Sequence, residues 1–88
     1  MANPLPKWLM KRYAVMWSEF GERHFAYEDA VKSLGENKSL VAVVLSNLNK
    51  LGWLDVNTDK SDSRKKMYTL KNIQIVLEEI AGQWKSKA

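Results

Sequence analysis

A cluster of cationic side chains near residue 64 is the feature of the sequence best suited to chemistry. Lys60 precedes the consecutive cations Arg64, Lys65 and Lys66, and residues 57–64 are rich in Asn, Asp, Ser and Thr. Adjacent like charges repel one another, so a fold tolerates them best on an exposed loop or at a strand edge. Such charge either protects an edge strand from aggregation or contacts phosphate. The cluster alone leaves both interpretations open.

The rest of the sequence contains few residues that could catalyse a reaction or bind a metal. The chain has no Cys and a single His, His24, which excludes a disulfide framework, a thiol nucleophile and a cysteine-based zinc site. The adjacent carboxylates at 28–29 and 78–79 do not converge when they lie on helices. No glycine-rich phosphate loop is present. We therefore expect a protein that is not an enzyme and that holds no metal and no cofactor.

The composition is that of a small folded domain with a modest positive charge. Of 88 residues 45% are hydrophobic, and 14 Lys and Arg stand against 10 Asp and Glu, for a net charge of +4. We expect residues 1–88 to form one domain with its own core. No stretch approaches the roughly 20 apolar residues that cross a bilayer, and the start lacks the order of a signal peptide. These features predict a cytoplasmic protein without membrane contact.

Periodicity supplies the elements that must position the cationic cluster. Apolar residues recur at helical spacing in four segments, and two short segments alternate as strands do. Glycines follow three of the helices, and prolines precede the first. The predicted helices cover 7–20, 27–34, 38–51 and 73–85, and the predicted strands cover 53–56 and 66–70. This order predicts a mainly α fold with a small antiparallel β-hairpin, the winged helix-turn-helix.

The third predicted helix has two distinct faces. Its apolar face comprises Val41, Val44, Leu45, Leu48 and Leu51. The opposite face comprises small and polar residues together with Val43, namely Ser39, Ala42, Val43, Ser46 and Lys50, flanked by Asn47 and Asn49. No acidic residue lies between Lys38 and Leu54, as expected of a helix that approaches phosphates in the major groove. The alternative is a solvated or protein-binding face.

The predicted hairpin and the helix end before it carry a specific string. Asp62 and Arg64 form an Asp-x-Arg string, Leu70 follows six residues after the arginine, and a Leu-Gly pair with an aromatic residue spans 51–53. With these residues the segment 37–70 resembles the corresponding part of the MarR family of winged-helix transcription regulators. The resemblance implies that Arg64 enters the minor groove and that Asp62 orients its side chain. Physically, a guanidinium suits a narrow, negative groove and is aligned by a carboxylate. The chain departs from the family in its length, because MarR proteins carry additional terminal helices.

The last predicted helix carries a long apolar stripe with two possible partners. The stripe comprises Ile73, Val76, Leu77, Ile80 and Trp84. It either packs across the first helix of the same chain or meets a second copy in a homodimer, where Trp8 would join the interface. The predicted interface residues are therefore Trp8, Ile73, Leu77, Ile80 and Trp84.

Together these patterns predict a DNA-binding transcriptional regulator of winged-helix type whose partner is double-stranded DNA. The predicted nucleic-acid contacts lie on the third helix and in the hairpin: Lys38, Ser39, Ala42, Val43, Ser46, Asn47, Lys50, Lys60, Arg64, Lys65 and Lys66, with Asp62 as the orienting residue. The alternative is a protein-interaction winged-helix module of a larger assembly, without direct readout of DNA.

Overall fold

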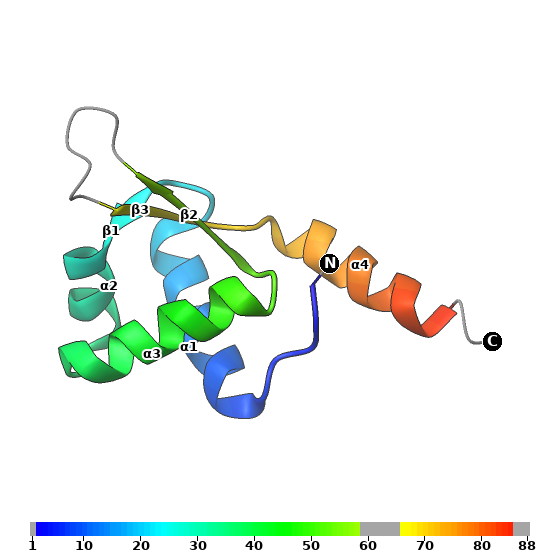
Figure 1. Ribbon diagram of the computed structural model, residues 1–88, viewed down its shortest axis with the longest axis horizontal. Helices are drawn as coiled ribbons and strands as arrows, with labels where there is room; N and C mark the ends of the chain where they lie inside the picture. The colour runs from blue at the N-terminus through cyan, green and yellow to red at the C-terminus, as the bar shows by residue number, and fades with distance from the viewer. Residues whose placement is uncertain (1, 59–65, 86–88) are drawn as a thin grey trace.

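The computed structural model describes residues 2–58 and 66–85, in which four helices pack with a small sheet. Along the chain the elements are α1 (Lys7–Phe20), β1 (Phe25–Ala26), α2 (Tyr27–Leu34), α3 (Lys38–Lys50), β2 (Leu54–Thr58), β3 (Lys66–Leu70) and α4 (Ile73–Lys85). Helices α1, α2 and α3 form one unit, the sheet lies along α3, and α4 extends away from the body (Figure 1). The predicted mainly α fold with a helix-turn-helix and an antiparallel hairpin is confirmed.

The core is built from the inward faces of all three helices of this unit and from the start of the hairpin. Leu9, Tyr13 and Leu48 are almost fully buried, as are Trp53 and Leu54. The indole of Trp53 meets the ring of Tyr13 edge to face, with the ring centroids 4.9 Å apart. Such aromatic pairs stabilise a fold by about 0.5–1.5 kcal/mol beyond the burial of their surface. This pair connects α1 to the segment that links α3 with β2.

The sheet has three strands, although the alternation of the sequence predicts only two. Its order is β1-β3-β2, and both pairings are antiparallel. The additional strand, β1, pairs Phe25 with Tyr68, and the Phe25 ring also stacks on Phe20 at 4.4 Å between centroids. A strand of two residues has no periodicity to reveal it, so the sequence indicates only an anchoring role for Phe25. By joining the hairpin to α2, β1 fixes the sheet relative to the helix-turn-helix.

The end of α3 differs from the prediction by a short shift that has a clear cause. The helix ends at Lys50 rather than at residue 51, and β2 covers Leu54–Thr58 rather than 53–56. The N–H of Trp53 donates to the carbonyl of Leu48 at 2.9 Å, and the N–H of Gly52 donates to Asn49 at 3.2 Å. This is the Schellman arrangement, which needs the positive φ of 85° that Gly52 adopts. Trp53 therefore belongs to the helix cap, not to the strand.

The N-terminal segment connects α4 with the end of α3. Ala2 is buried, its N–H donates to Glu79 of α4 at 3.2 Å, and its carbonyl accepts from Gln83. Asn3 connects to the end of α3. Its N–H donates to the carbonyl of Leu51 at 2.9 Å, and its carbonyl accepts from the indole N–H of Trp53 at 2.6 Å. Residues 2–3 thus connect α4, through Ala2, with the end of α3, through Asn3. Over the described parts of the chain, no helix is both long and apolar enough to cross a membrane.

The two faces of α3 should respond differently to truncation. Leu48 is completely buried, so Leu48→Ala should lower the free energy of unfolding by about 2–5 kcal/mol through lost contacts and a cavity. Val43 lies on the outward face with 47% of its surface exposed, so Val43→Ala should change that free energy by less than about 0.5 kcal/mol. Urea unfolding of the two variants measures both values. Equal losses would contradict the assigned orientation of α3.

Stability should also fall at high pH because of Tyr13. Burial, followed by the nearby charge of Glu22, raises the pKa of Tyr13 from 10.0 to about 12. The folded state thus favours the neutral phenol, so this contribution to stability is complete below the unfolded pKa and is lost as the pH rises to about 12. Between these pH values, the free energy of unfolding should fall more steeply with pH for the wild type than for Tyr13→Phe. Parallel pH dependences would show that Tyr13 does not resist ionisation.

Candidate nucleic-acid interface

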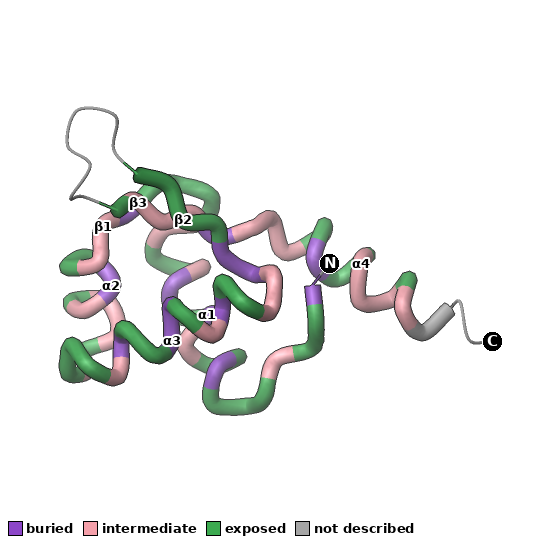
Figure 2. The backbone as a smooth tube through the Cα atoms, viewed as in Figure 1, coloured by how far each residue is buried: buried purple, intermediate pink, exposed green. Residues whose placement is uncertain are grey.

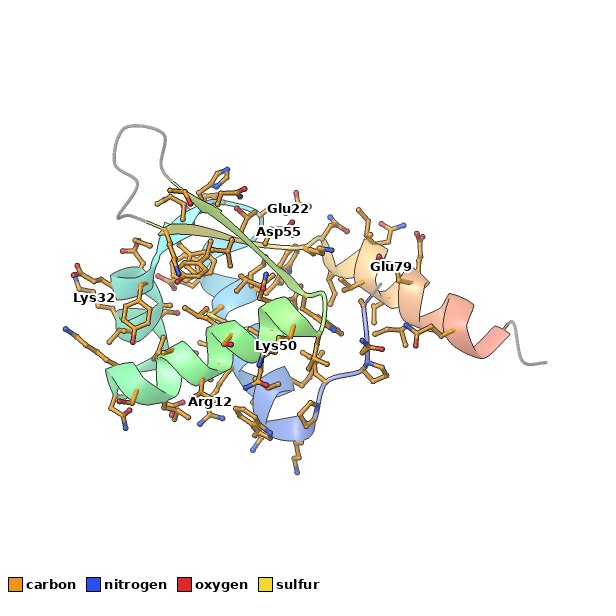
Figure 3. All side chains as sticks on the ribbon, in the orientation of Figure 1. Arg12, Glu22, Lys32, Lys50, Asp55 and Glu79 are labelled. Carbon is orange, nitrogen blue, oxygen red and sulfur yellow. The ribbon has the colours of Figure 1, made fainter. Side chains whose placement is uncertain are left out.

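The outward face of α3 is open along its whole length. Ser39, Ala42, Val43, Ser46 and Lys50 are all exposed and share one helical face, and Figure 2 shows exposed segments recurring along α3. Lys50 projects from its C-terminal end (Figure 3). Asn47 is also a predicted contact on this helix, but it is half-buried, and its side-chain amide donates to the carbonyl of Val43 at 2.9 Å. The structure therefore gathers five of the predicted residues on one face and places Asn47 at its edge.

The start of α3 is held by two side chains, those of Asn37 and Tyr27. Asn37 is the N-cap, and its Oδ1 accepts from the N–H of Leu40 at 2.8 Å. The hydroxyl of Tyr27 donates to the carbonyl of Lys38, which connects the start of α2 with the start of α3. The Lys38 side chain itself is exposed. N-caps of this kind stabilise a helix by about 1 kcal/mol.

The turn between α2 and α3 is braced against α1 by an ion pair. Arg12 of α1 contacts both carboxylate oxygens of Glu36, with Nε at 2.8 Å from Oε1 and Nη2 at 2.9 Å from Oε2. A bidentate pair of this geometry fixes direction as well as distance. Because Glu36 comes directly before the N-cap of α3, the pair sets the angle at which α3 leaves the turn. It also neutralises the carboxylate nearest the start of α3.

A hollow of about 400 Å³ lies between α3 and the sheet. Its lining is contributed by α2, α3, β2 and β3, and consists of Tyr27, Ala42, Leu45, Ser46, Asn49, Val56, Lys66 and Tyr68. We call it the α3–sheet hollow. No carboxylate is among these lining residues, and Asp55 alternates with Val56 on β2, so its side chain leaves the opposite face of the sheet. The hollow continues the outward face of α3 toward the hairpin without meeting negative charge.

Sequence reasoning missed most of the sheet side of this hollow. Val56 shares a face with the buried Leu54, yet 39% of its own surface is exposed, and it lines the hollow. Tyr68 also lines the hollow, and burial, followed by the proximity of Tyr27, raises the pKa of its hydroxyl. Its phenol therefore remains a neutral hydrogen-bond donor well above neutral pH. Tyr68 pairs across the hairpin with Val56, the middle residue of β2, so the two side chains meet at the sheet side of the hollow.

Two polar residues that line the α3–sheet hollow, Asn49 and Lys66, lie at the junction of α3 with the sheet and on the hairpin. The amide of Asn49 donates to the carbonyl of Leu54 at 2.8 Å and joins the end of α3 to the start of β2. Lys66 opens β3 opposite Thr58, and its side chain is exposed beside the α3–sheet hollow. The other hairpin residues of the predicted site, Lys60, Asp62, Arg64 and Lys65, lie outside the described residues.

The predicted interface residues occupy different environments. Trp8 and Leu77 have 40% and 52% of their surfaces exposed. Ile73 and Ile80 are half-buried and pack against the core, together with the fully buried Val76 of the same helix. The side chain of Trp84 lies outside the described residues. An unpredicted apolar residue, Ile75, is exposed on α4 as well.

Comparison with known proteins gives one sequence relative. No protein-family profile matches the chain. The methylase subunit of the type I restriction enzyme MjaVIII from Methanocaldococcus jannaschii is 38% identical over 71 residues, which are 81% of this chain and 12% of that subunit. The chain thus spans only a small part of the relative that it matches. A segment of similar sequence exists inside a much longer protein.

Solved structures of similar fold include BpsR and MepR. BpsR from Bordetella bronchiseptica superimposes with a TM-score of 0.64 at 21% identity, covering 97% of this chain and 65% of BpsR. A variant of MepR from S. aureus gives a TM-score of 0.65 at 17% identity, covering 96% of this chain and 66% of MepR. The chain therefore spans slightly less than two thirds of each. These neighbours have MarR-like winged-helix folds, so the comparison confirms the winged-helix fold and the MarR-like resemblance of the chain.

Proposed function

We propose that the chain is a DNA-binding regulatory module whose helix α3 enters the major groove of double-stranded DNA. The observation that carries this proposal is an open surface without carboxylates, formed by the outward face of α3 and the α3–sheet hollow. A surface that approaches phosphates is penalised by acidic side chains, and the chain has none from Lys38 to Leu54. An ordinary solvated helix carries glutamates on such a face.

The side chains on this face suit direct readout of bases. Ser39 and Ser46 can donate to and accept from base edges, and the exposed Val43 offers methyl groups to a thymine methyl. The small side chain of Ala42 lets the helix backbone approach the groove floor. Lys38 and Lys50 stand at the two ends of the helix, where phosphates flank the groove. In this arrangement the base contacts provide sequence specificity, and the lysine–phosphate contacts fix the position of the helix in the groove.

The hairpin contributes the second contact of the proposal. Lys66 lies beside the α3–sheet hollow and extends the positive surface from α3 onto β3. The MarR-like string adds Arg64 as the minor-groove residue, Asp62 as its orienting partner, and Lys60 and Lys65 as phosphate contacts. Among proteins of this fold, BpsR is described with regulated DNA binding, and a MepR variant that matches with a TM-score of 0.56 is bound to an oligodeoxyribonucleotide. Both support the assignment of DNA as the partner.

A second candidate is a protein-interaction module of a larger assembly. The match to a segment of a restriction-enzyme methylase subunit favours it, because there the similar sequence is one part of a longer chain. The surface suited to this role is on α4, where Ile75 and Leu77 have 54% and 52% of their surfaces exposed. The same helix would serve a homodimer, which raises the affinity of a weakly charged module by pairing two of them. The two candidates use different surfaces and can be tested separately.

A negative charge at the centre of the α3 face should prevent DNA binding without unfolding the protein. Ser46→Glu should weaken binding to duplex DNA about tenfold or more, because a carboxylate facing phosphates costs more than about 1.4 kcal/mol. The matched control is Ser18→Glu, which places the same charge at an exposed position of α1. Fluorescence anisotropy with a labelled duplex of mixed sequence measures both, and circular dichroism checks the fold.

The outcome separates the two candidates. Equal affinities of Ser46→Glu and Ser18→Glu would exclude α3 as the reading helix. If the wild type itself does not bind duplex DNA in low salt, the interaction module becomes the better account.

A further inference from the structure

A second cationic surface lies on α1, away from the predicted contacts on α3 and the hairpin. A hollow of about 390 Å³ is lined by Lys7, Trp8, Lys11 and Arg12, and we call it the α1 hollow. Lys7 and Lys11 are exposed, and Trp8 has 40% of its surface exposed between them. Every residue of this lining is cationic or aromatic. That combination is typical of surfaces that bind the sugar-phosphate backbone of nucleic acids.

The electrostatics of the α1 hollow are unfavourable in the free protein. The first turn of α1 contains no acidic residue, although the positive end of the helix dipole favours one there. Lys7 occupies that turn, and Lys11 lies one turn further, where like charges repel. Among the described residues neither lysine forms an ion pair. An anion bound between them would relieve both sources of repulsion.

Arg12 organises this surface rather than adding free charge to it. Its guanidinium is paired with Glu36, and Nη1 also donates to the carbonyl of Trp8 at 2.9 Å. The guanidinium carbon lies 6.0 Å from the centroid of the Trp8 ring. The ion pair that braces the start of α3 therefore also holds the Trp8 side chain. Arg12 thus connects the α1 hollow with the turn that precedes α3.

The position of the α1 hollow identifies which anion it suits. Helix α3 contacts both α1 and β2, and Figure 1 shows the first turns of α1 on one side of α3 and the hairpin strands on the other. Arg12 lies beside α3 on that first side (Figure 3). A duplex that receives α3 in its major groove presents a phosphate backbone on each flank of the helix. The hairpin meets one flank, and the α1 hollow is placed to meet the other.

A second copy of the chain fits this surface poorly. A two-fold interface centred on Trp8 would bring Lys7 and Lys11 toward the same lysines of the other copy. Like charges set against each other at an interface cost several kcal/mol. A polyanion removes this repulsion, whereas a dimer through Trp8 increases it. Charge complementarity therefore favours nucleic acid over self-association.

We infer that the α1 hollow is a second DNA-backbone site, in which Lys7 and Lys11 contact phosphates and the Trp8 ring packs against the sugar of the same strand. The inference rests on the proposed function, because it assigns the flank of a duplex that α3 reads. It adds phosphate contacts on the side of α3 opposite the hairpin. It also gives Trp8 a role other than the dimer contact that its exposure suggests.

The salt dependence of binding tests this inference. Lys7→Gln/Lys11→Gln should make the slope of log K against log salt shallower by about 1–2, since each phosphate contact contributes about 0.9. The control with the same net charge is Lys32→Gln/Lys71→Gln, in which Lys32 lies on α2 and points away from α3 (Figure 3). Anisotropy titrations use a duplex of about 30 base pairs, roughly three helical turns, at several salt concentrations. A third variant, Trp8→Ala, should weaken binding and leave the slope unchanged.

The possible results separate this site from the proposed function. If the control and the double lysine variant have the same slope while the wild type binds DNA, the α1 hollow is not a backbone site and the proposed function stands. If the wild type has no salt-dependent affinity for duplex DNA, both fail. Sedimentation equilibrium adds one more outcome: a wild-type dimer that becomes monomeric in Trp8→Ala would overturn the inference in favour of self-association.

Discussion

The attachment of α3 at both of its ends is the constraint on which the rest of the structure depends. At its start, the Asn37 cap and the Tyr27 hydroxyl hold the first turn. At its end, the Schellman turn at Gly52 directs Trp53 into the core against Tyr13. Between these points Val41, Val44, Leu45 and Leu48 are buried. Because α3 is fixed by its ends and its buried face, the side chains of its outward face are not needed to hold the fold. The proposed function uses this outward face.

Charge is distributed around α3 rather than concentrated in one place. The net charge of +4 is small, and the outward face of α3 has lysines only at its ends. Lys66 lies on one flank beside the α3–sheet hollow, and Lys7 and Lys11 lie on the other flank in the α1 hollow. Glu36, the acid nearest the start of α3, is neutralised by Arg12. A small positive charge on both sides of one helix suits a modest affinity for DNA that depends on simultaneous contacts with the two phosphate backbones.

Elements whose apolar residues recur at regular spacing were predictable from the sequence. Contacts between residues far apart in the sequence were not. The buried series of α3 has the spacing of one helical face, so its orientation and its exposed residues followed from the pattern. Strand β1 has two residues and forms only because Phe25 stacks on Phe20 and pairs with Tyr68. The α3–sheet hollow depends on Tyr27 and Tyr68, which come from different elements and approach only in the folded chain. The role of Ala2 as the connection to α4 likewise rests on hydrogen bonds of its backbone N–H and carbonyl with the side chains of Glu79 and Gln83, and an alanine in the sequence does not indicate such contacts.

The most direct test of the central claim is to follow the backbone amide signals of the isotope-labelled protein by NMR while duplex DNA is added. The account predicts that the largest changes occur at Ser39, Val43 and Ser46 on the outward face of α3, with further changes at Lys7 and Lys11. Leu77 on α4 should remain unaffected at concentrations where binding saturates. Changes confined to α4, with the α3 signals unmoved, would contradict the assignment of α3 as the DNA-reading helix.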